Sequence, residues 1–145
     1  MPLSDTFEND LMLLVFNNTN TADIGDATGL RGSSTAGSLY IALHTADPGE
    51  SGTASTSEAA YTGYARVAVA RSGAGFTVSA NAVSNAAAVT FGACTASSST
   101  VTYFSVTTAS SGTSKILWRG TTNSLAVTAG ITPSFAIGQL ACDIT

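Results

Sequence analysis

The most unusual property of this sequence is how little charge it carries. Asp, Glu, Lys and Arg make up 10% of its 145 residues, against roughly 25% in ordinary soluble domains. The hydrophobic fraction of 44% excludes intrinsic disorder, which needs low hydrophobicity together with high charge. A surface with so few charges is poor at keeping copies of a protein apart. We therefore expect the chain to be packed against partners in its working state.

Basic residues are especially scarce, and they form no run along the chain. Five Lys and Arg against nine Asp and Glu give a net charge of −4. This charge excludes nucleic-acid binding driven by the release of counterions from phosphates. No window approaches the ~18 uninterrupted apolar residues of a membrane span. The start, "MPLSDTFENDLMLLVF", lacks the basic region and cleavage site of a signal peptide. We predict neither nucleic acid nor membrane as a partner, and synthesis in a cytoplasm without export by the usual route.

Cysteine and histidine are also rare, which limits metal and redox chemistry. The two cysteines, Cys94 and Cys142, are too few for a disulfide scaffold. We interpret them as two small buried thiols, with a disulfide between them as the alternative. There is no C-x-x-C motif, and His44 is the single histidine, so no metal site is predicted.

One amphipathic helix is predicted at the front of the chain. Ser4 or Asp5 is a suitable N-cap, and Asp5 with Glu8 places negative charge in the first turn, where the helix dipole favours it. "NNTN" at 17–20 ends the helix, and a Gly- and Ser-rich loop follows. We predict residues 1–37 as a helix-and-linker arm. Its apolar face follows helical spacing and consists of Phe7, Leu11, Leu14 and Val15.

From residue 38 onward the hydrophobic period changes to that of β-strands. Short alternating runs are separated by Gly, Ser, Asn and Pro, which is typical of an antiparallel sandwich or barrel. We predict an all-β chain: one antiparallel β-sandwich or jelly-roll-like domain over residues 38–145, with about eight strands. The runs are "SLYIALH", "YARVAVA", "GFTVSA", "NAAAVTF", "STVTYFSVTT", "KILWRG", "SLAVT" and "PSFAIGQLACDI".

The polar loop after the first strand, "TADPGESGTASTSEAA" at 45–60, contains the candidate residues for a catalytic or ligand-binding site. A Ser–His–Asp triad would need His44 and Asp47, which are only three residues apart, and there is no G-x-S-x-G turn. Loop acids without aromatic platforms make a poor glycosidase site. The spacing does not fit a calcium loop, and phosphate-binding glycine motifs are absent. We predict no catalytic, metal-binding or cofactor-binding residues, and a chain that is not an enzyme. A capping or hydrogen-bonding role is expected for His44.

Two motifs carry a resemblance to a known family. "LHTADPG" at 43–49 and "YTGYARVAVAR" at 61–71, together with "SSGTSKILWRG" and the final "SLAVTAGITPSFAIGQL", resemble small virion proteins of tailed bacteriophages, commonly labelled tail fibre or head-decoration proteins. The resemblance implies a non-enzymatic structural protein of the virion. Within that class we predict a capsid decoration (cement) protein that stabilises the head. The alternatives are a tail fibre or tail adaptor component and a receptor (glycan)-binding module.

The same resemblance implies assembly partners and contact surfaces. We expect a homotrimer that binds the major capsid protein or other virion subunits, on the capsid surface or alternatively in the tail. Arg66 and Arg71 either fix strands and pair with acids such as Glu58, or are solvent-facing charges of little energetic weight. The full set of predicted interface residues is Phe7, Leu11, Leu14, Val15, His44, Asp47, Glu50, Glu58, Arg66 and Arg71.

Overall fold

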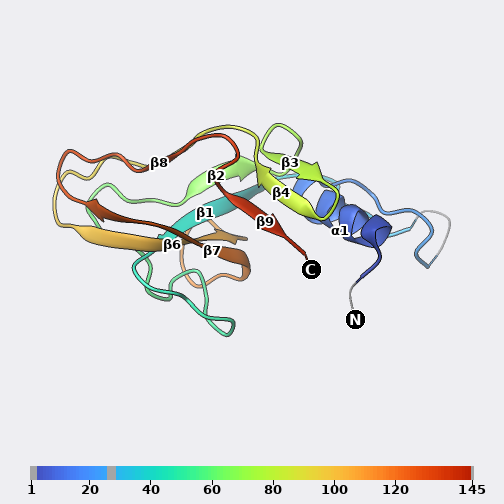
Figure 1. Cartoon of the computed structure of the whole chain (residues 1–145), viewed down its shortest axis with the longest axis horizontal. Helices are drawn as coiled ribbons and strands as arrows, with labels where there is room; N and C mark the ends of the chain where they lie inside the picture. Colours follow the sequence, from blue (N-terminus) through green and yellow to red (C-terminus); the bar gives the residue numbers. More distant parts are fainter. Residues whose placement is uncertain (1–2, 26–28, 145) are drawn as a thin grey trace. The chain divides into compact units, whose positions relative to one another are not determined.

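The computed structural model describes residues 3–25 and 29–144 (Figure 1). The described chain contains a helix, α1, near the N-terminus and the strands β1 to β9. It divides into two compact units, each built from separate segments. Unit 1 comprises Met1–Ser38, Ala70–Ala88 and Ala136–Thr145, and unit 2 comprises Leu39–Val69 and Val89–Phe135. The predicted arm therefore shares unit 1 with two later segments of the chain.

The strands form three sheets, and every resolved pairing between them is antiparallel. The prediction of an all-β chain with one N-terminal helix is thus confirmed. The jelly-roll-like sandwich arrangement stays a prediction.

In unit 1, α1 spans Asp5–Asn17. Its first turn is capped by Ser4, whose Oγ accepts the N–H of Phe7 at 3.4 Å, and the helix ends at Asn18 in the left-handed conformation (φ 57°). Asn tolerates this conformation better than most residues because its short polar side chain bonds locally. Here the Asn18 side chain accepts the N–H of Ser33 at 2.7 Å and donates to its carbonyl at 2.9 Å. The helix end predicted from "NNTN" is confirmed.

Helix α1 packs against β3 (Phe76–Ser79) and β4 (Ala82–Asn85), which pair with β9 (Ala141–Asp143) in the order β3-β4-β9. Phe16 makes an edge-to-face contact with Phe76, with ring centroids 5.2 Å apart. The buried residues of the helix are Glu8, Met12 and Phe16, whereas the predicted face is half-buried. Because residues 11–16 are apolar all round, helical spacing alone does not select the face that turns toward the sheet.

The buried side chain of Asn85 shapes the C-terminal part of unit 1. Its amide donates to the carbonyls of Ala87 (2.8 Å) and Ala136 (2.9 Å), and its Oδ1 accepts the N–H of Leu140 (2.9 Å). These bonds hold a turn in which Gly138 has φ 77°. The run 133–144, predicted as one strand, is therefore divided into β8 (Ser134–Phe135) and β9.

Unit 2 contains most of the larger sheet, in the order β2-β1-β6-β7, with β2 spanning Val67–Ala70. Strand β1 (Ser38–His44) is the run "SLYIALH" as predicted, and it pairs with β6 (Ser99–Thr107). Ile41 and Leu43 lie opposite Val106 and Phe104 on the apolar face. The alternate residues Tyr40, Ala42 and His44 lie on the other face, where His44 is a buried polar side chain. A separate two-stranded sheet pairs β5 (Val89–Thr90) with β8.

Strand β7 runs without interruption from Ile116 to Val127. The sequence predicted two strands here, separated by the turn-like residues "TTN". Instead the ladder with β6 shifts register, since Tyr103 faces Thr121 while Val101 faces Leu125. The irregularity absorbs the polar residues inside one strand, as β-bulges do.

A continuous line of aromatic contacts packs unit 2. Phe104 is central, with its ring centroid 5.1 Å from that of Trp118 and 5.9 Å from that of Phe135. The Phe104 ring fits because its cross-strand partner, Gly120, has no side chain: a Cβ there would lie 2.8 Å from the ring. Further ring contacts continue the line through Phe135–Phe91, Phe91–Tyr64 and Tyr64–Tyr61.

Candidate functional site

Loop 45–60 folds back beside the end of β1. The N–H of Thr45 donates to the Ser57 carbonyl and the N–H of Ala59 donates to the Leu43 carbonyl, both at 2.8 Å. An antiparallel bridge joins His44 and Glu58. At the start of the loop the Asp47 carboxylate accepts the N–H of Gly49 at 2.9 Å, a local bond of the kind that Asp side chains form in turns. The loop thus brings its acids next to the larger sheet.

His44 lies beneath this loop, and both of its ring nitrogens have partners. Nδ1 is 2.9 Å from the Thr56 carbonyl and Nε2 is 2.8 Å from the Ser105 hydroxyl. Because a carbonyl only accepts, Nδ1 carries the proton and Nε2 accepts from Ser105. Burial lowers the pKa of His44, which keeps the ring neutral. The hydrogen-bonding role predicted for His44 is confirmed.

A Ser–His hydrogen bond is also the geometry of an activated nucleophile. Here, however, His44 and Ser105 are both 0% exposed. No substrate reaches either side chain in this structure. Asp47, the carboxylate considered for a triad in the sequence analysis, instead forms an ion pair with Arg119, with Oδ1 2.8 Å from Nε. The arrangement supports a structural role for the pair.

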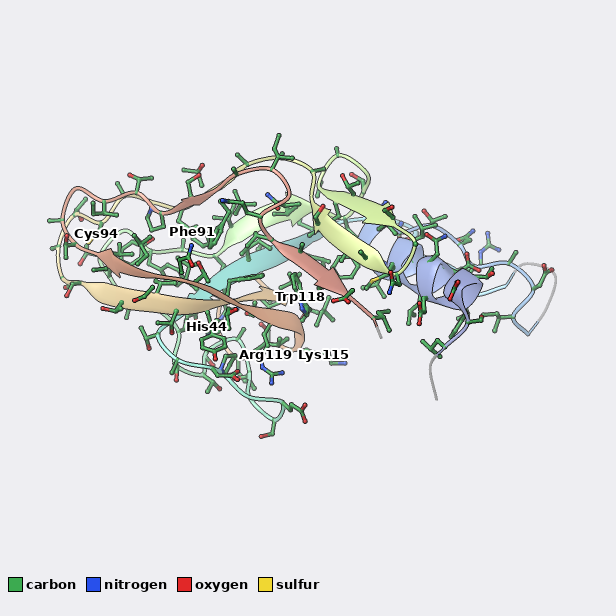
Figure 2. The ribbon with its side chains drawn as sticks, viewed as in Figure 1. His44, Phe91, Cys94, Lys115, Trp118 and Arg119 are labelled. Carbon is green, nitrogen blue, oxygen red and sulfur yellow. The ribbon has the colours of Figure 1, made fainter. Side chains whose placement is uncertain are left out.

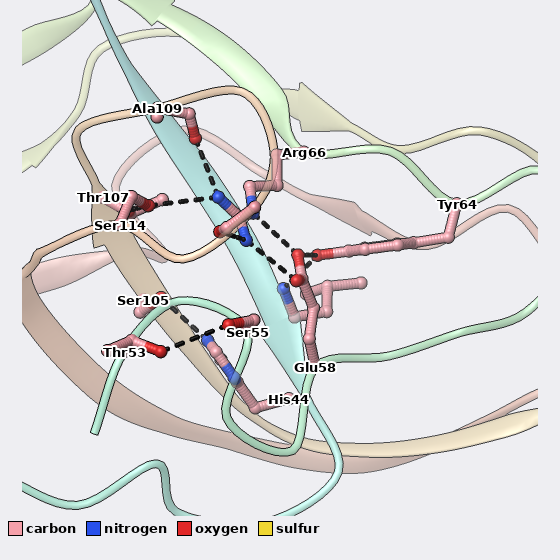
Figure 3. Close-up of polar contacts among 12 residues, drawn as sticks. His44, Thr53, Ser55, Glu58, Tyr64, Arg66, Ser105, Thr107, Ala109 and Ser114 are labelled. Atoms are coloured by element: carbon pink, nitrogen blue, oxygen red, sulfur yellow. Dashed lines mark hydrogen bonds and ion pairs between the residues drawn. The ribbon is translucent and has the colours of Figure 1, made fainter.

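Next to His44 lies a second cluster, centred on the ion pair of Arg66 and Glu58 (Figure 3). Arg66 Nε donates to Glu58 Oε1 at 2.7 Å, and Nη2 donates to Oε2 at 2.8 Å. This two-pronged geometry is among the strongest forms of carboxylate recognition. The bonds to Glu58 raise the pKa of Arg66, so the guanidinium stays charged. The pairing of Arg66 with Glu58 that the sequence suggested is therefore present.

The remaining donors of Arg66 reach the loop between β6 and β7. Nη1 donates to the Ala109 carbonyl (3.0 Å) and to Ser114 Oγ (3.1 Å), and Nη2 donates to the Gly112 carbonyl (2.8 Å). The guanidinium thus fixes a loop that lies more than forty positions further along the chain.

Tyr64 completes the cluster on the Glu58 side. Its hydroxyl donates to Glu58 Oε1 at 2.9 Å and accepts the N–H of Leu43 at 3.1 Å. Burial raises the pKa of Tyr64, so the phenol remains a donor. Within the described residues, no fully buried side-chain nitrogen or oxygen is left without a hydrogen bond. A network this complete rigidifies the structure rather than offering free groups for chemistry.

An open groove lies on the exposed side of the loop. It has a volume of about 590 Å³ and is bordered by Asp47, Gly49 and Glu50 from the loop, by Tyr103 from β6 and by residues 116–121 of β7. Asp47 is held there by Gly49 and Arg119, and these bonds lower the pKa of its carboxyl group. Figure 2 shows Lys115, Trp118 and Arg119 along this part of the chain. The groove combines carboxylates, a guanidinium and an aromatic ring on an accessible surface.

The structure distributes the predicted interface residues over three places. His44, Glu58 and Arg66 belong to the network just described, and Asp47 and Glu50 lie at the groove. Arg71 holds the end of α1, with Nε donating to the Val15 carbonyl and Nη2 to the Leu14 carbonyl, both at 2.6 Å. The apolar residues Phe7, Leu11, Leu14 and Val15 are half-buried on α1 in unit 1. Their use as contacts with other subunits stays a prediction.

Sequence reasoning missed several members of these clusters. Nothing in the sequence indicated that Ser105 and Ser114 are hydrogen-bonding partners in these clusters, that Tyr64 binds Glu58, or that Arg119 pairs with Asp47. The available signal was the period of two: Ser105 lies on the same face of β6 as Tyr103 and Thr107. Its contact with His44 follows only once the register of β1 against β6 is known.

The structure shows no further site type in the part of the chain that it describes. Residues 3–25 and 29–144 contain no group of three His, Cys, Asp or Glu side chains that could hold a metal ion. Both cysteines are free thiols, Cys94 buried and Cys142 half-buried. No described helix has the length and apolar character required to cross a bilayer.

The fold is β-rich, and the side chains of His44, Glu58 and Arg66 are hydrogen-bonded to other groups of the chain itself. Comparison with protein families identifies the kind of particle to which the chain belongs. Residues 2–143 match the model of the family described as podophage GP4 fiber I protein gp80. The chain belongs to this family of phage virion proteins, which confirms the resemblance to phage virion proteins seen in the sequence. A search of curated proteins finds no match.

Proposed function

We propose that the chain is a non-enzymatic fibre subunit of a podophage particle. The observation that carries this proposal is the family match, which covers residues 2–143 and whose description names a fibre protein. This favours the tail fibre component, an alternative in the sequence analysis, over the capsid decoration protein that the sequence analysis preferred.

The site supports a structural task over a catalytic one. The two groups with nucleophile–base geometry, Ser105 and His44, are fully buried. The Arg66–Glu58 cluster uses its donors on the protein's own carbonyls and hydroxyls. Both clusters brace the loops of unit 2, which supports a structural subunit.

Capsid decoration remains the second candidate because one observation favours it. The apolar residues Phe7, Leu11, Leu14 and Val15 of α1 are only half-buried, and each such side chain contributes roughly 1.5–3 kcal/mol when fully buried. An anchor of that kind suits a protein that clamps neighbouring capsid subunits. In this candidate the partner is the major capsid protein and the assembly is the predicted homotrimer.

Copy number and position in purified virions separate the two candidates. Quantitative mass spectrometry should give a few to a few dozen copies per particle, and antibody-gold labelling should place them on the tail. A copy number near that of the major capsid protein, with label over the head, would contradict the fibre assignment and support decoration. Absence from purified particles would contradict both.

A further inference from the structure

The open groove of unit 2 lies over one face of the larger sheet. Tyr103 is the cross-strand partner of Thr121, and Ser105 is the partner of Arg119. Because cross-strand partners and alternate residues of a strand share a face, these four side chains lie on the same side of the sheet. Ser105 is fully buried, whereas the other three border the groove of about 590 Å³. This face is therefore closed at Ser105 and open at the groove.

The polar groups along the groove have hydrogen-bonding capacity that the fold does not use. Arg119 Nε and the N–H of Gly49 both donate to the same oxygen of Asp47, Oδ1. Four groups at the groove make no hydrogen bond within the described chain: Oδ2 of Asp47, the terminal nitrogens of Arg119, the Glu50 carboxylate and the Tyr103 hydroxyl. The Asp47 and Arg119 side chains are 44% and 31% exposed. A ligand can therefore bond to these groups without breaking a bond of the fold.

These groups fit a ligand that carries hydroxyls. A carboxylate only accepts and a guanidinium only donates, whereas a hydroxyl does both. The ion pair holds a free acceptor of Asp47 next to free donors of Arg119, an arrangement that suits two neighbouring hydroxyls and is fixed before binding. A purely apolar ligand would leave these groups unpaired, which is costly.

The charges around the groove balance. The acids Asp47 and Glu50 are matched by Arg119 and by Lys115, the exposed residue directly before β7. A balanced site attracts neither anions nor cations by its net charge, and the chain as a whole, at −4, repels polyanions. The groove thus favours an uncharged ligand.

The groove also has the apolar surface that a sugar ring requires. A sugar ring carries hydroxyls at its rim and C–H groups on its faces, so it needs polar and apolar surface in one site. Tyr103 provides a half-buried aromatic ring and Leu117 an apolar side chain that is 37% exposed. Trp118 packs instead on Phe104. The volume lies within the roughly 300–1,000 Å³ of small-ligand sites.

We propose that this groove binds an uncharged oligosaccharide. Neighbouring hydroxyls of one ring bond to Asp47 and Arg119, a C–H face packs on Tyr103, and Glu50 accepts from a further hydroxyl. Sugar binding goes beyond the proposed function, which assigns the chain to a part of the particle and names no ligand. It is a property of the isolated chain, so it holds or fails independently of the fibre and decoration assignments.

A microarray of microbial oligosaccharides, neutral and acidic, probed with the full chain, tests the proposal. We expect binding to neutral members. In an NMR titration with the best neutral glycan, the signals that shift should be those of the residues that border the groove. Binding to no neutral glycan, a preference for acidic ones, or shifts confined to other parts of the chain would overturn the proposal.

Two substitutions remove groups that have no bonding role in the fold. Tyr103→Phe and Glu50→Ala should each weaken glycan binding about 3- to 10-fold, the effect of one lost hydrogen bond, and leave urea unfolding unchanged. The matched control is Tyr40→Phe, at a half-buried position outside the groove, which should alter neither. Arg119→Met should weaken binding at least ~10-fold, whereas Arg31→Met should not. Binding that is unaffected in the Tyr103, Glu50 and Arg119 variants contradicts the site.

Discussion

Arg66 and Glu58 form a two-pronged ion pair in which both guanidinium–carboxylate distances are below 3 Å, at 2.7 and 2.8 Å. The Arg66 side chain is 1% exposed, while that of Glu58 is 19% exposed. Together they join loop 45–60, the segment before β2 and the β6–β7 loop. One guanidinium thus links three segments of unit 2.

Replacing that guanidinium should cost much of the stability of the fold. Arg66→Met leaves the Glu58 carboxylate without its partner, and breaking a buried pair typically costs about 3–5 kcal/mol. The free energy of unfolding in urea measures the loss. The matched control is Arg31→Met at an exposed position, which should change stability by less than ~0.5 kcal/mol. Equal effects of the two substitutions would show that the ion pair is energetically unimportant.

Asn85 should be the most sensitive polar position of unit 1. Asn85→Ala removes its bonds to Ala87, Ala136 and Leu140 and leaves buried backbone groups unsatisfied, each at about 1–3 kcal/mol. We expect a loss of about 3 kcal/mol in thermal or urea unfolding. Asn123→Ala, at an exposed position in β7, is the control. Retained stability together with fast exchange of β9 amides would mean that the turn adapts around the missing side chain.

The end of α1 should loosen when Arg71 is replaced. Its guanidinium satisfies the Leu14 and Val15 carbonyls and places a positive charge where the helix dipole favours it. Arg71→Met should cost about 1–2 kcal/mol and speed hydrogen exchange in the last turn of α1. Exchange rates in that turn equal to those of Arg31→Met would argue against this role.

Stability should fall as the solution becomes mildly acidic, through His44. Burial lowers the pKa of His44 in the folded protein below its usual 6.5, against smaller opposing effects of the Thr56 carbonyl, Glu58 and Asp47. As the pH falls, His44 therefore becomes protonated in the unfolded state before it does so in the folded state. The stabilisation is present above pH ~6.5 and is lost as the pH falls toward the folded pKa, by up to ~1.4 kcal/mol per pH unit.

Urea unfolding at pH 7.5 and pH 5.5 measures this dependence. Because His44 is the single histidine of the chain, His44→Gln should flatten the slope between these values. A slope that persists in the variant would assign the effect to other groups.

The features that the sequence predicted well are those decided by neighbouring residues. The cap at Ser4, the stop at "NNTN" and the alternation of β1 need no distant partner. Strands β8 and β9 were merged because the turn between them is held by Asn85, some fifty positions earlier in the chain. The predicted gap within β7 was wrong for a related reason: pairing with β6 carries the polar residues through an irregular ladder.

Prediction of the site from sequence was also limited to contacts between nearby residues. Loop 45–60 was recognised as unusual, and the pairing of Arg66 with Glu58 was anticipated. The inward position of His44 was not foreseeable, because its partner Ser105 is 61 positions away. The groove likewise appears only when the pairing of β6 with β7 is known.

The way the two units divide the chain has a consequence for biosynthesis. Unit 2 uses residues 39–69 and 89–135, whereas unit 1 needs α1, the hairpin of β3 and β4, and residues 136–145. Because protein chains emerge from the ribosome N-terminus first, β3 and β4, against which α1 packs, are translated well before β9. The sheet β3-β4-β9 is therefore completed only after both segments of unit 2 have been translated.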